Sequence, residues 1–299
     1  MTIGNKRILV IGYGRIGHAM ESMLAPNHAL MYTDIRPVSP HEPVELEQAA
    51  AAAEFVICCV HVTPLAEVAA RIRPHLREDA ISLTVAKGLD EEGRPASSIF
   101  ADVFGDSHHY CALYGPMIAE DIIQGRMAFA QVGCSRPEVY ARIEALFHDT
   151  VLRLQYSDDM PGIAWSSVLK NVYAILFGAV DELALGDNVR GYLAVETLAE
   201  MAAIVQAMGG DAATVLQVAG LGDLVTTATS ESSRHHTLGR QLVRGDYPDK
   251  PAEGLHTLAM IDKFGLIDTQ PYPLFRLVQQ IVSDRDRIDG HIRAWLDSL

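Results

Sequence analysis

The sequence predicts an α/β protein with two domains: a doubly wound parallel sheet over residues 1–157 and an all-helical domain over residues 158–299. Three observations support this. In the first half, short apolar runs alternate with amphipathic segments, which is typical of βαβ units. A glycine-rich string follows the first apolar run directly. From about Gln155 onward, long helical periodicities continue without a convincing strand.

We expect six strands and a first helix in the N-terminal domain. These apolar runs do not alternate with polar residues, which favours a sheet that is covered on both faces. The expected strands are Arg7–Ile11, Ala29–Thr33, Phe55–Val60, Ile81–Val85, Tyr110–Tyr114 and Met127–Val132, and the helix is Arg15–Leu24.

The second domain is expected to consist of helices around one apolar helix. Apolar residues recur at helical spacing from Trp165 to Val180, and the surrounding segment contains one charged residue, Lys170. This predicts a buried helix, with no membrane insertion. The other expected helices are Leu193–Met208, Ala212–Ala219, Ser232–Val243, Ala252–Phe264 and Pro273–Ser283.

Composition restricts the classes of partner. The chain has 299 residues, 49% of them hydrophobic, and a formal net charge of −14. This acidic surface should repel nucleic acid and anionic membranes, so an anionic ligand needs a local cluster of cations. The four cysteines lack metal-ligand spacing, and we expect reduced thiols, no metal and a cytoplasmic location.

The glycine-rich string predicts a Rossmann-type dinucleotide site. Gly12, Gly14 and Gly17 form G-x-G-x-x-G between the first strand and its helix. Such glycines allow a tight turn, a close approach to pyrophosphate and close packing of helix on strand. Asp34 ends the second strand, where a carboxylate binds both ribose hydroxyls and repels a 2′-phosphate. NAD is therefore favoured over NADP, although Arg36 could accommodate the phosphate.

Two lysines are candidates for proton transfer and for contact with the substrate. Lys170 lies in a helix that is apolar all round, where burial should lower the pKa of its ammonium towards the range useful for proton transfer. Snorkelling to solvent is the alternative. Lys87 follows an apolar strand, where it could reach a phosphate or a carbonyl oxygen. A plain surface lysine is the alternative there.

The segment Gly220–Gly239, which reads GLGDLVTTATSESSRHHTLG, holds the positive cluster that the acidic background requires. Its glycines should keep Asp223 rigid and partly buried. Ser233 and Arg234 begin a helix, and a hydroxyl and a guanidinium at a helix start suit a phosphate. The alternative is a solvated basic helix end.

These motifs together resemble the bacterial-type NAD(P)-dependent glycerol-3-phosphate dehydrogenases. The resemblance runs over nearly the whole chain, and the Gly220 to Arg234 stretch is its most specific part. The matching strings are GYGRIG, AKGL at Ala86 to Leu89, GPMIAED at Gly115 to Asp121, LKN at Leu169 to Asn171, the Gly220 segment and AEG at Ala252 to Gly254.

The resemblance implies hydride transfer between NAD(P)H and dihydroxyacetone phosphate or sn-glycerol 3-phosphate, with Lys170 as proton acceptor. We expect Lys170, Lys87 and Asp223 to be catalytic. The expected substrate-binding residues are Lys87, Gly115, Lys170, Asp223, Thr227, Ser233, Arg234 and His235. The expected cofactor-binding residues are Gly12, Gly14, Arg15, Ile16, Gly17, Asp34, Lys87, Ala119, Arg234 and Glu253.

Two departures from the family pattern affect the phosphate site. Met117 replaces a usual serine or threonine, and a thioether cannot donate a hydrogen bond as a hydroxyl does. His235 replaces a usual asparagine, and imidazole can still donate.

The rival functions are a ketopantoate reductase-like enzyme acting on another small anionic keto substrate, and a non-catalytic dinucleotide sensor. The sequence leaves the oligomeric state open, with a homodimer as one option.

Overall fold

A seven-stranded sheet organises the N-terminal domain in the computed structural model, which describes residues 4–231, 233–246 and 253–299. The strand order is β2-β1-β3-β4-β5-β6-β7. All neighbours are parallel except β5 and β6, which run antiparallel. The strands are β1 (Arg7–Ile11), β2 (Ala29–Thr33), β3 (Phe55–Cys58), β4 (Ile81–Thr84), β5 (His109–Tyr114), β6 (Ala128–Gly133) and β7 (Leu152–Ser157).

The predicted strands are confirmed, and one further strand was missed. β7 lies at the edge of the sheet, and exposed residues such as Arg153 and Gln155 interrupt its apolar residues. An edge strand with one solvent-exposed face lacks the continuous run of apolar residues that identifies the buried strands. The expected domain boundary after residue 157 lies between β7 and the next helix, and it stays a prediction.

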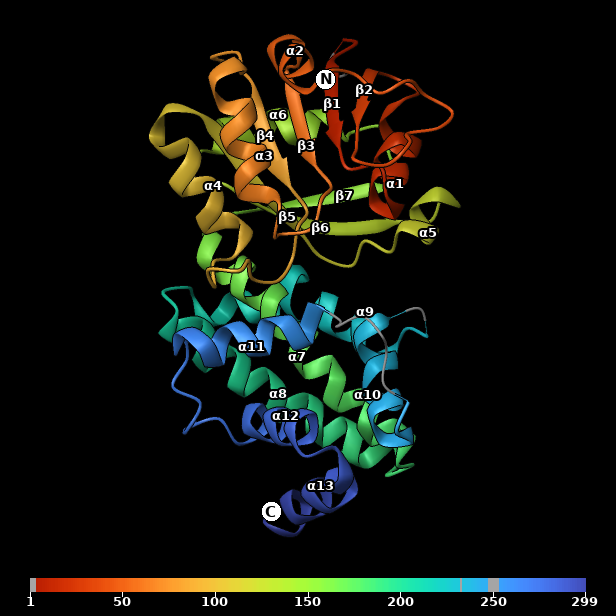
Figure 1. The fold of residues 1–299 in the computed structure, drawn as a ribbon, viewed down its shortest axis with the longest axis vertical. Coiled ribbons are helices and arrows are strands. Elements are labelled where there is room, and N and C mark those ends of the chain that lie inside the picture. The colour runs from red at the N-terminus through yellow and green to blue at the C-terminus, as the bar shows by residue number, and fades with distance from the viewer. Residues whose placement is uncertain (1–3, 232, 247–252) are drawn as a thin grey trace.

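Helices cover both faces of the sheet (Figure 1). Successive residues of β1 alternate between two cores: Ile8 and Val10 pack in one, and Leu9 and Ile11 in the other. This is why the strand sequence is apolar at every position. The helices of this domain are α1 (Arg15–Leu24), α2 (Leu46–Ala52), α3 (Leu65–Ile72), α4 (Ala96–Phe104), α5 (Ala119–Ile123) and α6 (Pro137–Leu146).

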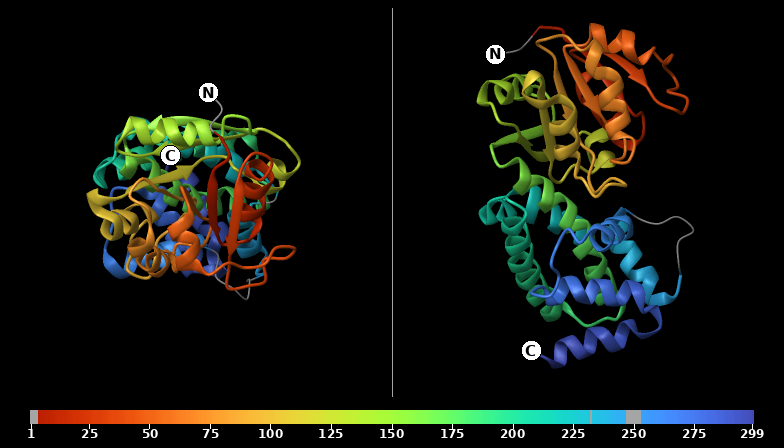
Figure 2. Two further views of the ribbon diagram at one scale, coloured as in Figure 1. Left: turned by 90° about the horizontal axis from the view of Figure 1, so that it is seen from above. Right: turned by 60° about the vertical axis from the view of Figure 1, so that its left-hand side comes forward.

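The second domain is helical throughout its described residues. It lies below the sheet in Figure 1 and in the right view of Figure 2, with the two termini at opposite ends of the molecule. Its α-helices are α7 (Met160–Glu182), α8 (Asp187–Ala207), α9 (Asp223–Thr229), α10 (Arg234–Arg244), α11 (Glu253–Phe264), α12 (Pro273–Ser283) and α13 (Ile288–Asp297).

The expected helix over Ala212–Ala219 is wrong in type. A 3₁₀ helix, η3 (Ala212–Leu216), is followed by a π-helical turn, η4 (Val218–Gly222), which leads directly into α9. The predicted starts at Ser232 and Ala252 lie outside the described residues, and the described parts of those helices are α10 and α11. The C-terminal helix α13 was not expected.

The apolar helix α7 is the centre of the helical domain. Every residue from Gly162 to Val180 is buried. Although α7 is long and apolar enough to cross a membrane, its apolar window is entirely covered by protein, so α7 is a core helix of this domain. Near its start, Ile163 and Ala164 pack against Tyr114 of β5, so the same helix also contacts the sheet.

Candidate active site

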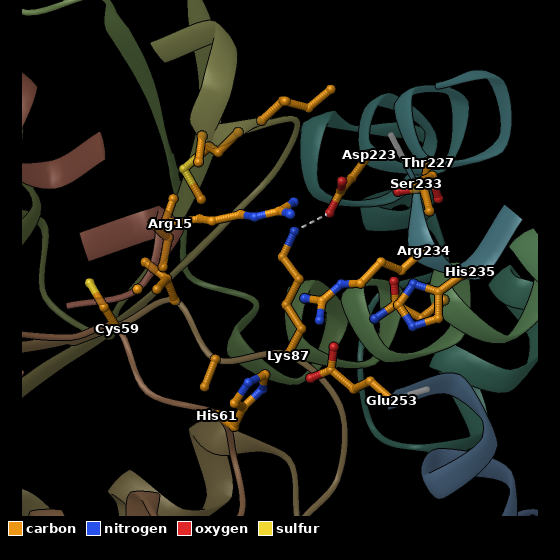
Figure 3. A pocket seen from close by; sticks show the side chains of 18 of the residues that line it. Arg15, Cys59, His61, Lys87, Asp223, Thr227, Ser233, Arg234, His235 and Glu253 are labelled. Carbon is orange, nitrogen blue, oxygen red and sulfur yellow. Dashed lines mark hydrogen bonds and ion pairs between the residues drawn. The ribbon is translucent and has the colours of Figure 1, made fainter. Parts of the chain in front are cut away.

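A cavity of about 530 Å³ lies where the sheet meets the helical domain (Figure 3). Loops at the carboxyl ends of β1, β3 and β4 form one wall, and α7, α9, α10 and α11 form the other. In doubly wound sheets, ligands bind beyond the carboxyl ends of the strands, at the point where the strand order reverses. Here that point lies between β1 and β3.

The glycine loop is shaped for a pyrophosphate. Gly12 has a φ of +94°, and a Cβ there would lie 2.8 Å from the carbonyl carbon of Cys59. A Cβ on Gly17 would lie 2.3 Å from the carbonyl oxygen of Gly12, so α1 packs directly on the loop. Gly14 has open space around it and lines the cavity. The backbone amides at the start of α1 are therefore accessible to a phosphate.

Asp34 lies beneath this loop rather than on the cavity wall. Its Oδ2 accepts a hydrogen bond from the Tyr13 backbone N–H at 2.6 Å, and its Oδ1 accepts one from the Arg36 N–H at 2.9 Å. Arg36 itself lines the cavity. The carboxylate thus braces the glycine loop, and each oxygen keeps a further lone pair for a ribose hydroxyl.

Two lysines and one aspartate meet at the centre of the cavity. Lys87 Nζ donates to Asp223 Oδ2 at 2.5 Å, as Figure 3 shows, and lies 3.3 Å from the carbonyl oxygen of Gly115. Lys170 Nζ donates to the Thr227 hydroxyl at 2.6 Å and lies 3.2 Å from Asp223 Oδ1. One carboxylate therefore holds two ammonium groups that come from different domains.

Burial controls the protonation of this cluster. Lys170 is 6% exposed, and burial lowers its pKa to about 8 although the nearby Asp223 carboxylate acts in the opposite direction. Burial alone would raise the pKa of Asp223, but the charges of Lys170 and Lys87 outweigh it and lower the pKa below its usual value. Asp223 is therefore ionised at neutral pH while Lys170 can exchange a proton there.

The π-helical turn explains how Asp223 reaches this position. Asp223 is the first residue of α9, directly after Gly222. A Cβ on Gly220 would lie 2.1 Å from the carbonyl oxygen of Val215, so the turn closes only with glycine there. From the sheet side, the buried Gln131 of β6 accepts a hydrogen bond from the Ala219 N–H at 2.8 Å. Both contacts hold the segment that carries the carboxylate.

The first turn of α10 forms the end of the cavity that suits a phosphate. Ser233 caps the helix, and its hydroxyl accepts a hydrogen bond from the His236 N–H. Arg234 reaches from this turn into the cavity, beside Lys87 (Figure 3). Burial, aided by the charges of Lys170 and Arg234, lowers the pKa of His235 to about 3, so its ring is neutral. Its Nε2 has no hydrogen-bond partner among the described residues.

The cavity brings together most of the predicted site residues. Those that line it are Gly14, Arg15, Ile16, Lys87, Ala119, Lys170, Asp223, Thr227, Ser233, Arg234, His235 and Glu253. Gly12, Gly17, Asp34 and Gly115 do not line it. Gly12 and Gly17 shape the glycine loop, Asp34 accepts a hydrogen bond from that loop, and the Gly115 carbonyl oxygen accepts one from Lys87. Both departures from the family pattern, Met117 and His235, lie on its wall.

Several lining residues were not among the predicted site residues. Cys59 and His61 follow β3, and Glu120 lies in α5, where it forms an ion pair with Arg15 at 3.2 Å. Thr226 adds a hydroxyl one residue before Thr227. For Cys59 and His61 a signal was available, because the loop after β3 lies at the same sheet edge as the glycine loop. Glu120 lies in the GPMIAED string and Thr226 in the Gly220–Gly239 segment.

Comparison with known families covers most of the chain. The N-terminal model of NAD-dependent glycerol-3-phosphate dehydrogenase matches residues 37–140, and the C-terminal model matches residues 159–293. A glycerol-3-phosphate dehydrogenase [NAD(P)+] of Deinococcus radiodurans is 34% identical over 79% of this chain and 71% of its own length. That of Agrobacterium fabrum is 31% identical over 93% of both chains.

Solved structures of low sequence identity share the fold. Glycerol-3-phosphate dehydrogenase from Coxiella burnetii superposes with a TM-score of 0.82 at 22% identity, over 98% of this chain and 99% of the other. A PanE/ApbA family ketopantoate reductase from Ralstonia eutropha reaches a TM-score of 0.56 at 17% identity, over 94% and 99%. Taken with the two family models and the bacterial relatives, the chain belongs to the NAD-dependent glycerol-3-phosphate dehydrogenase family.

Proposed function

We propose that this protein transfers a hydride between NAD(P)H and dihydroxyacetone phosphate or sn-glycerol 3-phosphate. One observation carries the proposal: Lys170, Asp223 and Lys87 meet on a cavity whose walls also include the glycine loop and the start of α10. A dinucleotide site, a proton-transfer group and a phosphate site would therefore share one cavity.

The dinucleotide would be held by the glycine loop, with Gly14, Arg15 and Ile16 at the pyrophosphate and Asp34 at the adenosine ribose. The residues fit this role because Gly14 leaves open space above the start of α1. Bound nicotinamide supplies the acceptor or donor of the hydride. Arg36 on the cavity wall is the residue that could contact a 2′-phosphate.

Lys170 would carry the proton. In the oxidative direction, neutral Lys170 takes the proton of the C2 hydroxyl, and in the reductive direction protonated Lys170 donates a proton to the carbonyl oxygen. Ionised Asp223 orients the lysine and balances its charge. Lys87, which donates to the other oxygen of Asp223, would polarise the same substrate oxygen.

The phosphate of the substrate would lie at the start of α10. Ser233 and Arg234 offer a hydroxyl and a guanidinium there, and His235 offers a neutral ring. The backbone amides of the first turn add partial positive charge. Because His235 is neutral, the fixed positive charge at this end comes from Arg234 and the helix.

The direct test is oxidation of NADH and NADPH with dihydroxyacetone phosphate, run beside ketopantoate and other keto acids. We expect turnover with dihydroxyacetone phosphate and a loss of about 10²–10⁴-fold in Lys170→Ala, the usual contribution of a positioned acid or base. Lys263→Ala, which removes an exposed lysine of α11, is the matched control and should behave like the parent.

Each rival function predicts a different result. Turnover with ketopantoate and none with millimolar dihydroxyacetone phosphate would favour a ketopantoate reductase-like enzyme. Binding of NADH without any turnover, and a Lys170→Ala variant identical to the parent, would favour a dinucleotide sensor.

The preference for NAD over NADP belongs to the same proposal and rests on Asp34. Asp34→Asn keeps an acceptor beneath the glycine loop but removes the charge that repels a 2′-phosphate. We expect the ratio of kcat/KM for NADH to that for NADPH to fall about tenfold, which corresponds to ~1.4 kcal/mol. A ratio that rises instead would contradict the role of Asp34.

Location and assembly complete the proposal. A cytoplasmic location fits the four cysteines, all of which are free thiols. A homodimer stays a prediction, and light scattering on the purified protein in solution would test it.

A further inference from the structure

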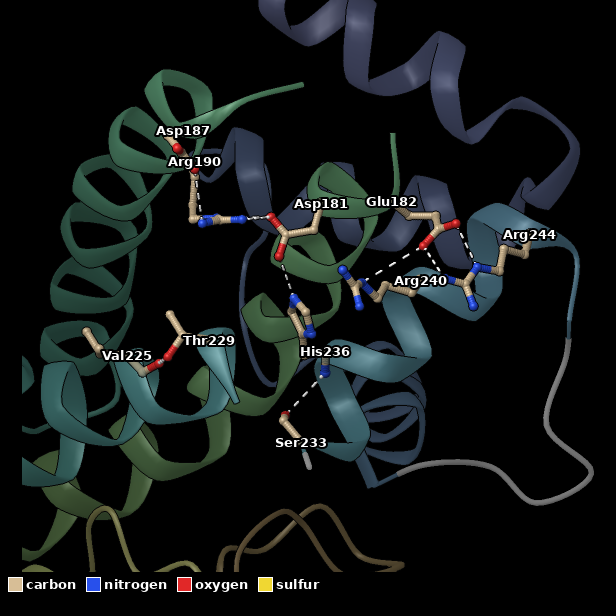
Figure 4. Close-up of polar contacts among 10 residues, drawn as sticks. All are labelled: Asp181, Glu182, Asp187, Arg190, Val225, Thr229, Ser233, His236, Arg240 and Arg244. Carbon is tan, nitrogen blue, oxygen red and sulfur yellow. Dashed lines mark hydrogen bonds and ion pairs between the residues drawn. The ribbon is translucent and has the colours of Figure 1, made fainter. Parts of the chain in front are cut away.

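The first turn of α10 is attached to α7 by a buried histidine–aspartate contact that lies outside the cavity. His236 Nε2 and Asp181 Oδ2 are 2.7 Å apart, and the two side chains are only 6% and 10% exposed (Figure 4). The backbone N–H of His236 also donates a hydrogen bond to the Ser233 hydroxyl, with 3.3 Å between the nitrogen and the oxygen. The side chain of His236 therefore anchors the turn that presents Ser233, Arg234 and His235.

The carboxylate of Asp181 is itself fixed from a third helix. Its Oδ1 accepts hydrogen bonds from Arg190 Nη2 at 2.6 Å and Nε at 3.0 Å. Arg190 belongs to α8, so the chain His236–Asp181–Arg190 joins the start of α10, the end of α7 and the start of α8 (Figure 4). With both oxygens occupied, the carboxylate has one orientation, and so has the imidazole bonded to it.

The same helix carries the proton-transfer lysine. Asp181 follows Lys170 by 11 residues, which is about three turns, so both side chains leave nearly the same face of α7 about 16 Å apart along its axis. Lys170 contacts Asp223 and Thr227, whereas Asp181 contacts His236. One rigid helix therefore sets the separation between the reacting centre and the turn at the start of α10.

We infer that the His236–Asp181–Arg190 chain is a positioning device for the substrate's phosphate, which places the first turn of α10 at a fixed distance from Lys170. The inference rests on the proposed function for its substrate. None of the three residues lines the cavity, so they act through Ser233, Arg234 and His235. The buried His235 ring, whose Nε2 is unpartnered among the described residues, is one of the groups so positioned.

Asp181→Asn tests the inference, because an amide places its oxygen toward only one of the two partners and presents an NH2 group, which cannot accept, to the other. In the full-length enzyme we expect kcat/KM for dihydroxyacetone phosphate to fall about tenfold, mainly through KM. We expect kcat/KM for dihydroxyacetone, which lacks the phosphate, to change by less than twofold. The inhibition constant of inorganic phosphate should rise by about the same factor as KM.

The neighbouring residue provides a matched control. Glu182 forms an ion pair of 2.6 Å with Arg244 at the far end of α10, where the arginine side chain is half exposed (Figure 4). Glu182→Gln should therefore leave the kinetics with dihydroxyacetone phosphate and with dihydroxyacetone unchanged. At position 236, glutamine retains a side-chain donor and leucine does not. His236→Gln should therefore keep more phosphate affinity than His236→Leu.

Two results would overturn the inference: parental kinetics in Asp181→Asn, or equal losses with dihydroxyacetone and its phosphate, which would show general destabilisation only. If the parent protein itself does not turn over dihydroxyacetone phosphate, that result would instead contradict the proposed function. In that case, calorimetry of inorganic phosphate binding to the NADH-loaded parent and Asp181→Asn proteins decides the inference. Equal or undetectable binding in both would overturn it as well.

Discussion

At the scale of single residues, the proposed proton transfer depends on how the ammonium group of Lys170 is buried. Lys170 is the only charged residue between Pro161 and Val180, and this pattern predicted its burial. An isolated ammonium in such a helix would be costly, but Asp223 and Thr227 satisfy it from α9. Burial still dominates, and the pKa of Lys170 is lowered to about 8.

The pH dependence of the two directions should therefore be opposite. In the proposed mechanism reduction uses protonated Lys170, so its kcat/KM should fall as pH rises through about 8, the pKa of this group. Oxidation needs the neutral amine, so its kcat/KM should rise through the same range. Initial rates from pH 6 to 10 in both directions measure this. Parallel profiles would show that another group carries the proton.

At the scale of elements, α7 and α10 touch backbone to backbone. A Cβ on Gly239 would lie 1.9 Å from the carbonyl oxygen of Ile175, and one on Gly178 would lie 2.0 Å from that of His236. Only glycine allows this approach, which brings the start of α10 close to the helix that carries Lys170. The close crossing and the His236–Asp181 pair thus fix the same two helices.

Gly239→Ala should separate these helices. We expect the free energy of unfolding to fall by about 2 kcal/mol or more, since overpacking at a backbone contact forces a shift. Gly191→Ala is the control: Gly191 is exposed in α8 with nothing near its Cβ direction, and alanine there should stabilise by about 0.5–1 kcal/mol. Urea denaturation measures the change in the free energy of unfolding of each variant. Equal changes in the two variants would argue against a close crossing of α7 and α10.

At the scale of the whole molecule, the site exists because two domains share it. Lys87 comes from the sheet domain and Lys170 from the helical domain, and Asp223 binds both. Gln131, fully buried in β6, crosses the same boundary to the Ala219 N–H and also donates a hydrogen bond to the side chain of Gln217. The cluster of cations lies in this junction, although the chain as a whole carries a charge of −14.

Gln131→Leu should therefore affect stability and catalysis together. The Ala219 N–H would lose its acceptor, a cost of about 1–3 kcal/mol, and the turn before Asp223 would loosen. We expect a lower kcat as well as a lower melting temperature. Gln155→Leu is the control, because Gln155 is the partner of Gln131 in the β6–β7 register but is exposed. A Gln131 variant with parental kcat would show that the contact does not position Asp223.

The sequence by itself determined the features that depend on local pattern. Continuous apolar runs identified six of the seven strands, helical periodicity identified α7, and the spacing of Gly12, Gly14 and Gly17 identified the dinucleotide loop. The edge strand β7 and the π-helical turn before Asp223 were missed, because their conformations are selected by neighbours distant in the sequence.

Only the tertiary structure decided which of these residues act together. Lys87 and Asp223 are separated by 136 positions, and no periodicity predicts that one carboxylate binds both lysines. The attachment of α10 through His236 and Asp181, and the place of Asp34 beneath the glycine loop, are likewise contacts between distant segments. Local propensity acts over a few residues, whereas burial and charge pairing are settled by packing of the whole chain.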